Sequence, residues 1–268
     1  MFIRALKSGL AIAAFAFPTW VSAMDNPVTL TVLKGWRQAD GTHMAAIKLD
    51  LEKGWKTYWR KPGDAGIPPF FDFLGSGNLI DFDVKWPTPT VFDQGGLTSV
   101  GYKDSVILPI ILTPKKPNRD VKLRGIIDIG VCKEICLPLS LDINVRLDAD
   151  QTDRSPVISA ALASVPFTQT EAGVKSAVCK LTFLDGVMAV STDVAMPSAG
   201  GAEHVILESA NDDHWLSDAT SSRSGGSLRS SGELASLSGG TVALNRSDIR
   251  ITVLGRDHAV DIQGCTGS

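Results

Sequence analysis

Period-two alternation of apolar and polar residues dominates the first half of the chain. The clearest example is HMAAIKLDLEKGW (residues 43–55), in which Ile47 and Leu49 alternate with Lys48 and Asp50. Such alternation predicts strands with one buried face. The same reasoning predicts further strands at 28–36, 105–112, 121–130 and 139–147. Turn signals rich in Gly and Pro separate these segments, and many short punctuated strands are typical of a β-sandwich.

The pattern changes between about residues 150 and 170. Ser155 is a candidate N-cap and Pro156 a first helical residue, which predicts a short helix or linker. Strand patterns then return from Cys179, with Asp185-Gly186 as a hairpin turn. They recur in EHVILESA (203–210) and DIRITVLGRDHAVDIQGC (248–265). The polar segment SSRSGGSLRSSG (221–232) is rich in Gly and Ser and predicts a flexible surface loop.

This organisation predicts an all-β protein with an amino-terminal sandwich and a second, smaller β domain. The expected divisions are a leader at 1–23, a first domain at 24–150, a linker or short helix at 151–170 and a second domain at 171–268.

The first 23 residues have the features of an export signal. Arg4 and Lys7 precede the apolar run LAIAAFAF (10–17), and small residues precede a cleavage site near Ala23. The run is too short to span a bilayer, for which roughly 20 residues are needed, so an uncleaved anchor is the less favoured alternative. Charges or prolines interrupt every later apolar run. The chain is therefore expected to be exported, not membrane-spanning, and placed where disulfides persist.

Charge excludes one class of partner. The leader holds two basic residues and no acidic one, so its removal changes the formal net charge from −3 to −5. Nucleic-acid binding requires a basic surface, and this balance argues against it.

Four cysteines in an exported chain allow three fully paired connectivities. Locality and domain placement favour Cys132–Cys136 together with Cys179–Cys265, the second bond joining the two ends of the second domain. In the chain-entropy model a loop of five residues stabilises by about 2 kcal/mol and one of 87 by about 4.6 kcal/mol. The short bond is therefore expected to be reduced more easily, by about 50 mV.

The flanking sequence also favours a redox role for the short bond. Strand patterns on both sides place Cys132 and Cys136 at the open end of a hairpin, where a partner thiolate reaches sulfur. Lys133 would favour a thiolate at Cys132 electrostatically, and Glu134 would oppose that effect.

Other roles for the pair fit the sequence less well. One alternative is a static clip across the hairpin end. A zinc site would need more ligands, but the other cysteines lie in a different domain and no two histidines stand at i, i+4 spacing. The scattered histidines are His43, His204, His214 and His258. A thiol hydrolase with a histidine base would leave Cys136 unexplained. Phosphate-loop, dinucleotide and nucleophile-elbow motifs are absent. No metal is expected on the ligand spacing, and no cofactor is expected because electrons in thiol–disulfide exchange travel as dithiol.

Several short motifs occur together in the order typical of one family. They are GWKTYWRKPGDAGIPPFFDFLGSGN (54–78), WPTP (86–89), Gly101-Tyr102, Leu108-Pro109 and CKEICLP (132–138). Over about residues 28–148 the chain resembles the periplasmic amino-terminal domain of the DsbD and ScsB disulfide reductases. The second half is similar, more weakly, to the extension that follows this domain in ScsB-like chains.

The resemblance implies an immunoglobulin-like sandwich that exchanges disulfides in the periplasm without a cofactor. Its redox pair, which maps onto Cys132 and Cys136, would take electrons from a membrane thiol/disulfide electron-transfer protein and pass them to disulfide-containing substrate proteins. Residues expected near the sulfurs are Tyr58, Trp59, Asp64, Tyr102 and Glu134. The alternative for three of them is structural, with Trp59 and Tyr102 as core aromatics and Asp64 as a turn residue.

The chain departs from the family in two respects. Three residues separate the cysteines, whereas the better-known DsbD domains have five. The membrane segment and the terminal thioredoxin-like domain of the complete reductases are missing from this sequence. Electrons would therefore come from a separate membrane protein, or the chain has lost the electron-transfer role.

The sequence therefore predicts a periplasmic thiol–disulfide oxidoreductase. The main competing hypothesis is a non-catalytic binding or chaperone module with a structural disulfide. A third is a copper-handling protein, because ScsB-like systems are associated with copper stress, but Met and His are few and unclustered.

Overall fold

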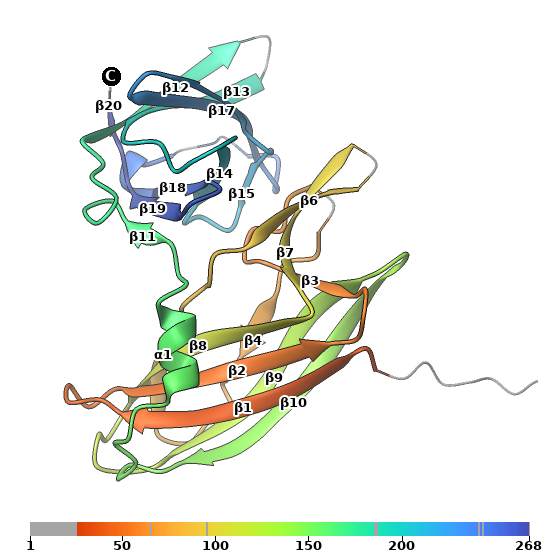
Figure 1. Ribbon diagram of the computed structural model, residues 1–268, viewed down its shortest axis with the longest axis vertical. Coiled ribbons are helices and arrows are strands. Elements are labelled where there is room, and N and C mark those ends of the chain that lie inside the picture. The colour runs from red at the N-terminus through yellow and green to blue at the C-terminus, as the bar shows by residue number, and fades with distance from the viewer. Residues whose placement is uncertain are drawn as a thin grey trace, which may run out of the picture.

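The computed structural model describes residues 26–64, 66–94, 96–184, 187–240, 242 and 244–267. These residues form two β domains, one above the other in Figure 1, joined by a short helix and an extended segment. The prediction of an all-β, immunoglobulin-like sandwich followed by a second β domain is confirmed. The leader at 1–23 and the Asp185-Gly186 turn lie outside the described residues. In the part of the chain that is described, no helix has the length and apolar character needed to cross a bilayer.

Two antiparallel sheets form the first domain. The first sheet has the order β1 (Val28–Arg37), β2 (His43–Leu51), β8 (Ser105–Pro114) and β5 (Leu79–Val84). The second sheet has the order β10 (Cys136–Leu147), β9 (Val121–Cys132), β3 (Lys56–Tyr58), β7 (Leu97–Lys103) and β6 (Thr90–Gln94), and β4 (Phe70–Asp72) also pairs with β9. The sequence pattern predicted a strand from residue 43 to residue 55. The strand β2 instead ends at Leu51, and the chain turns after it, with Gly54 at a φ of 86°.

The core of the first domain lies between these sheets and follows the predicted alternation. Ile47 and Leu49 of β2 pack with Leu108 and Ile110 of β8 in one hydrophobic cluster that also includes Leu123 and other residues of β9 and β10. Burial of apolar area at about 25 cal/mol per Å² is the main force that closes such a sandwich.

Helix α1 (Pro156–Leu162) covers the outer face of the first sheet. Ser155 caps it as predicted, accepting a hydrogen bond from the backbone N–H of Ile158. The Ile158 side chain is fully buried and packs with Trp36, Met44 and Ala46 of β1 and β2. The chain enters the second domain soon after α1, because β11 (Phe167–Thr168) pairs in parallel with β19 of that domain.

The second domain is also a pair of packed sheets. Its first sheet has the order β11, β19 (Ala259–Gln263), β18 (Ile249–Leu254) and β14 (His204–Ser209). Its second sheet has the order β15 (His214–Leu216), β17 (Ser227–Ser236), β13 (Val187–Ala195), β12 (Ser176–Leu184) and β20 (Thr266–Gly267), with β16 (Thr220–Ser224) also on β17. A short 3-10 helix spans Arg246–Asp248. A disulfide joins Cys179, fully buried in β12, to Cys265 just before β20.

The prediction of a flexible loop at 221–232 is wrong. This segment forms the β16–β17 hairpin, turning at Gly225, whose φ is 58°. Leu228, Ser230 and Leu234 alternate on the buried face of β17, so small polar residues continue an apolar period of two. The hydroxyl of Ser230 is 2.6 Å from that of Thr192 on β13, which satisfies both buried groups. Composition alone does not reveal this pattern, because serine occurs both in loops and at strand positions where its hydroxyl is hydrogen-bonded.

Candidate active site

Cys132 and Cys136 close the tight end of the β9–β10 hairpin. Cys132 is the last residue of β9, Cys136 is the first of β10, and the two are paired in register and joined by a disulfide. Their surroundings differ sharply. Cys132 is 1% exposed, whereas Cys136 is exposed and follows Ile135, which is 56% exposed. The expectation that a partner thiolate can reach the sulfur from outside therefore fits Cys136 and not Cys132.

The phenol of Tyr58 lies against both sulfurs. Its hydroxyl donates a hydrogen bond to Sγ of Cys132 at 2.8 Å and is 3.4 Å from Sγ of Cys136. The side chain is 2% exposed, and burial raises the pKa of the phenol above its ordinary value. Tyr58 therefore remains a neutral O–H donor at neutral pH, directed at the buried sulfur.

A close approach of backbone and side chains encloses the Tyr58 ring. Gly130, two residues before Cys132, has no room for a side chain, since a Cβ there would lie 2.5 Å from Cβ of Ile67 and 3.0 Å from Cδ2 of Tyr58. Sequence reasoning missed Ile67 and Gly130. A glycine inside a strand pattern signals such a close approach and could have identified this position.

A buried lysine lies on the same sheet face as Cys132. Lys56 of β3 is directly opposite Cys132 in the β3–β9 register, and side chains opposed in this way share a face. Its Nζ donates a hydrogen bond to the Ser99 hydroxyl at 3.1 Å and lies 5.0 Å from the centre of the Phe92 ring. Burial, with a smaller contribution from Lys103, lowers the pKa of Lys56. Sequence reasoning did not identify this cation.

The other residues expected near the sulfurs lie in different environments. Trp59 is fully buried and Tyr102 nearly so, and both belong to the core of the first domain. The Tyr102 hydroxyl donates to the carbonyl oxygen of Pro87 at 2.8 Å. Asp64 is exposed in the loop after β3, and Glu134 is exposed in the turn between the cysteines. Of the expected set, Tyr58 is the residue that the structure brings into hydrogen-bonding distance of the pair.

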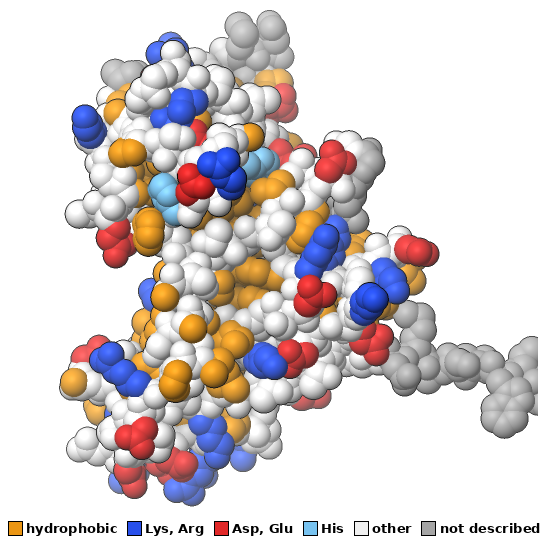
Figure 2. All heavy atoms as spheres, viewed as in Figure 1, with side chains coloured by type: hydrophobic (Ala, Val, Ile, Leu, Met, Phe, Trp, Pro, Cys, Tyr) orange, Lys and Arg blue, Asp and Glu red, His pale blue; other side chains and the backbone are white. Residues whose placement is uncertain are grey.

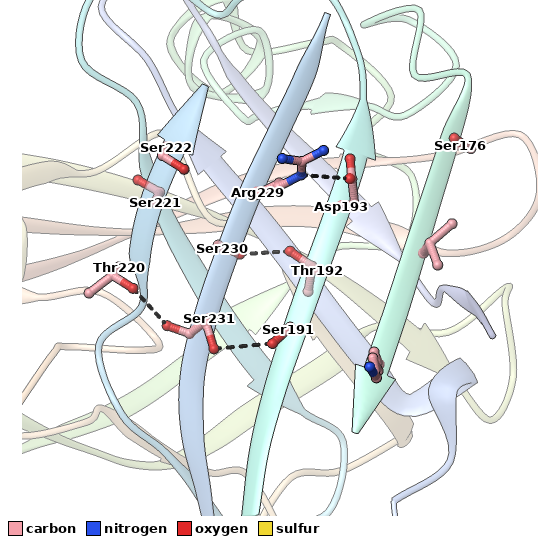
Figure 3. A pocket seen from close by; sticks show the side chains of 12 residues that line it. Ser176, Ser191, Thr192, Asp193, Thr220, Ser221, Ser222, Arg229, Ser230 and Ser231 are labelled. Carbon is pink, nitrogen blue, oxygen red and sulfur yellow. Dashed lines mark hydrogen bonds and ion pairs between the residues drawn. The ribbon is translucent and has the colours of Figure 1, made fainter. Parts of the chain in front are cut away.

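A sizeable hollow of about 630 Å³ lies elsewhere, on the outer face of the second sheet of the second domain (Figure 3). Serine and threonine side chains line it, and several side chains there bond to one another, as Ser191 does to Ser231 and Arg229 to Asp193. Among the described residues, no group of three or more His, Cys, Asp or Glu side chains is arranged to hold a metal.

Residues 30–144 match the family model of "Thiol:disulfide interchange protein DsbD, N-terminal". The matched range contains β3 with Tyr58 and the hairpin with both cysteines. The first domain is a DsbD-type amino-terminal domain.

Solved structures extend the likeness in fold to both domains. The chain is similar to the N-terminal periplasmic domain of ScsB from Proteus mirabilis, with a TM-score of 0.68 and 18% identity over 93% of this chain and 97% of that one. A protein of unknown function from Porphyromonas gingivalis W83 also aligns over 89% of this chain, at 12% identity and a TM-score of 0.24 that supports no structural argument. No protein of curated function matches the sequence.

The DsbD-type membership gives the hairpin a chemical context. The family is one of thiol–disulfide interchange proteins. In this DsbD-type domain one cysteine of the pair is exposed and the other is buried.

Proposed function

We propose that this chain is a periplasmic thiol–disulfide oxidoreductase that passes reducing equivalents through Cys132 and Cys136. The observation that carries the proposal is the asymmetry of the pair, with Cys136 exposed and Cys132 buried beneath the Tyr58 hydroxyl. An asymmetric pair suits stepwise exchange, since one sulfur is open to attack and the other is held as the leaving group.

The exchange proceeds through a mixed disulfide. A thiolate of a reduced donor attacks Sγ of Cys136, forming an intermolecular S–S bond, and the Cys132–Cys136 bond breaks with its electron pair on Cys132. The second thiol of the donor, as thiolate, then attacks the donor sulfur of the mixed disulfide and releases Cys136 as a thiolate. The donor leaves oxidised and the pair is reduced by two electrons. The reverse sequence reduces a substrate disulfide.

The buried Tyr58 hydroxyl favours negative charge at Cys132. The Tyr58 hydroxyl donates to its sulfur, and a hydrogen bond to an ionised acceptor is roughly twice as strong as one to a neutral acceptor. That hydrogen bond stabilises the thiolate leaving group more than the disulfide, so it lowers the barrier to opening the bond.

The proposed donor is a membrane thiol/disulfide electron-transfer protein, and the proposed acceptors are disulfide-containing proteins of the same compartment. Membership of the interchange family and the likeness in fold to the periplasmic domain of ScsB support this placement. Electrons travel as dithiol, so no cofactor is assigned.

Single-cysteine variants test the proposal with matched chemistry. Cys132→Ser leaves the exposed Cys136 thiol, and Cys136→Ser leaves the buried Cys132 thiol. Reaction of each reduced variant with glutathione disulfide is followed by mass spectrometry. We expect the Cys132→Ser variant to form the mixed disulfide at least about tenfold faster, because access of glutathione disulfide to Cys136 outweighs the larger thiolate fraction that the Tyr58 hydroxyl gives Cys132.

The wild-type protein supplies the decisive control. Under native conditions dithiothreitol should reduce its Cys132–Cys136 bond without unfolding. If that bond stays oxidised until the domain unfolds, the disulfide is structural and the non-catalytic binding module replaces this proposal.

A further inference from the structure

The segment that follows Tyr58 leaves the active site and then returns to it. Trp59 enters the core, and its backbone N–H donates to the carbonyl oxygen of Val100 at 2.9 Å. At the other end, Gly66 lies against the phenol, since a Cβ there would be 2.9 Å from Cδ1 of Tyr58. Ile67 follows and lies against Gly130, whose Cβ position is also close to Cδ2 of Tyr58. The described residues of this stretch, 59–64 and 66–67, are called here the return segment, and they hold Tyr58 against the sulfurs.

The second domain fastens this return segment between its two contacts with Tyr58. Arg60 donates two hydrogen bonds to the carboxylate of Glu208, at 3.0 and 2.9 Å, and a third to the Thr252 hydroxyl at 3.0 Å. Lys61 donates from Nζ to the carbonyl oxygen of Leu216 at 2.7 Å. Figure 1 shows the second domain at the end of the first domain that holds β3, β6 and β7.

The Arg60–Glu208 contact is well shielded from water. The exposed fractions of the two side chains are 12% and 16%, and the guanidinium lies 3.7 Å from the centre of the Trp59 ring. A forked pair of this kind fixes orientation as well as distance. Apolar packing continues around it, because Ile206, Leu254 and Ala259 of the second domain belong to the same hydrophobic cluster as the first-domain core. Figure 2 shows hydrophobic side chains gathered at this junction.

We infer that the second domain acts on the redox pair through the Arg60–Glu208 contact, which makes Arg60 and Glu208 positioning residues for the Tyr58 hydroxyl. The inference rests on the proposed function and goes beyond it by assigning a role to the second domain. Arg60 is two residues from Tyr58 and is held from a strand 148 positions further along the chain. When the contact is weakened, the return segment gains freedom and the Tyr58 hydroxyl stays near the sulfur for less of the time.

The direction of the effect follows from the charge on sulfur. The Tyr58 hydrogen bond stabilises the Cys132 thiolate more than it stabilises the disulfide. Weakening Arg60–Glu208 therefore makes the pair harder to reduce and raises the pKa of the Cys132 thiol. Coupling between two sites is reciprocal, so reduction of the pair also strengthens the domain contact by the same factor.

The test compares variants of the full-length chain. Glu208→Gln keeps the shape of the side chain and removes its charge. Glu203→Gln is the matched control. Glu203 forms a buried ion pair with Arg223 inside the second domain, and it directly precedes β14, the strand that contains Glu208. The equilibrium constant for reduction by dithiothreitol is measured for both at a mildly alkaline pH, with thermal melts to verify folding. We expect Glu208→Gln to lower that constant about fivefold and Glu203→Gln to leave it unchanged.

A double variant separates positioning from a general loss of stability. In a Tyr58→Phe background, Glu208→Gln should have no further effect on the equilibrium constant, because the hydroxyl through which it acts is gone. Arg60→Lys keeps the charge but loses the forked geometry, so it should also lower the constant.

The outcomes distinguish this inference from the proposed function. If wild type exchanges with dithiothreitol and Tyr58→Phe alters the constant while Glu208→Gln and Arg60→Lys do not, the positioning role is refuted and the redox function stands. If Glu208→Gln acts equally with and without the Tyr58 hydroxyl, the role is also refuted. A wild-type pair that does not exchange refutes both.

Discussion

The Tyr58 hydroxyl donates a hydrogen bond to Sγ of Cys132 at 2.8 Å, although the two residues are 74 positions apart. The contact joins β3 to the end of β9, and the enclosed ring keeps its proton because burial raises the pKa of the phenol. In the proposed exchange this geometry makes Cys132 the sulfur that carries charge when the disulfide opens. The exposed Cys136 is then the proposed point of attack by other proteins.

Replacing Tyr58 with Phe should raise the pKa of the Cys132 thiol in the reduced protein. Loss of a hydrogen bond to a charged group costs about 1.5–3 kcal/mol, which corresponds to at least about one pKa unit. The thiolate absorbance of a Cys136→Ser background, titrated with pH, measures this shift. Tyr102→Phe is the control, since its hydroxyl bonds to Pro87 and its loss should leave the titration unchanged. An unshifted titration in Tyr58→Phe would remove the role assigned to Tyr58.

The two disulfides should be reduced in a fixed order. In the chain-entropy model, the loop of 87 residues closed by Cys179–Cys265 stabilises by about 2.5 kcal/mol more than the five-residue loop of Cys132–Cys136. Cys179 is also fully buried. Titration with glutathione buffers should reduce the 132–136 pair first, at a potential above the roughly −300 mV typical of structural bonds. Peptide mapping of alkylated samples reads the order, and simultaneous reduction of both bonds would contradict it.

Removing the second disulfide should weaken the second domain without ending exchange. Replacing Cys179 and Cys265 with Ala should lower the free energy of unfolding by about 2–4 kcal/mol, because the unfolded chain regains the freedom of a long loop. Denaturant unfolding measures this loss. At temperatures where both domains remain folded, the reaction with dithiothreitol should continue, since Arg60 and Glu208 keep their contact. Loss of exchange in a folded double variant would give this disulfide a direct role in the chemistry.

Acid should destabilise the first domain through His43. The side chain is fully buried, its Nε2 is 2.6 Å from the carbonyl oxygen of Lys34, and its Nδ1 has no hydrogen-bond partner among the described residues. Desolvation by burial lowers the pKa of this imidazole, so the unfolded state binds the proton first. Stability is therefore full above the unfolded pKa of about 6.5 and falls as the pH drops toward the folded value, by up to about 1.4 kcal/mol per pH unit.

His43→Gln keeps a donor near the position of Nε2 and removes the titration. Its free energy of unfolding should depend less on pH below about 6.5 than that of wild type. The control is His258→Gln, which changes a half-buried histidine beside Phe167. The pH dependence of its free energy of unfolding is compared with that of His43→Gln. Equal pH dependence in wild type and His43→Gln would assign the acid sensitivity to other groups.

The sequence by itself determined the features that depend on local chemistry. Alternation at Ile47 and Leu49 predicted a strand because successive side chains of a strand point to opposite faces, whatever the partner strand is. Ser155 and Pro156 predicted the helix start because capping satisfies backbone groups within a few residues. The spacing of Cys132 and Cys136, with strand patterns on both sides, predicted a disulfide at the end of a hairpin.

Only the tertiary structure decided which sulfur is open and what surrounds the other. The burial of Cys132 depends on Tyr58 from β3 and on the return segment, which packs over Gly130. Tyr58 and the return segment are both far from Cys132 in the sequence. The buried contact of Arg60 with Glu208 spans 148 positions. The serine-rich segment can form strand β17 because the buried hydroxyl of Ser230 forms a hydrogen bond with that of Thr192 on the neighbouring strand. In each case the stabilising free energy comes from a contact with a residue that is distant in sequence. The local sequence pattern does not specify which distant residue that will be.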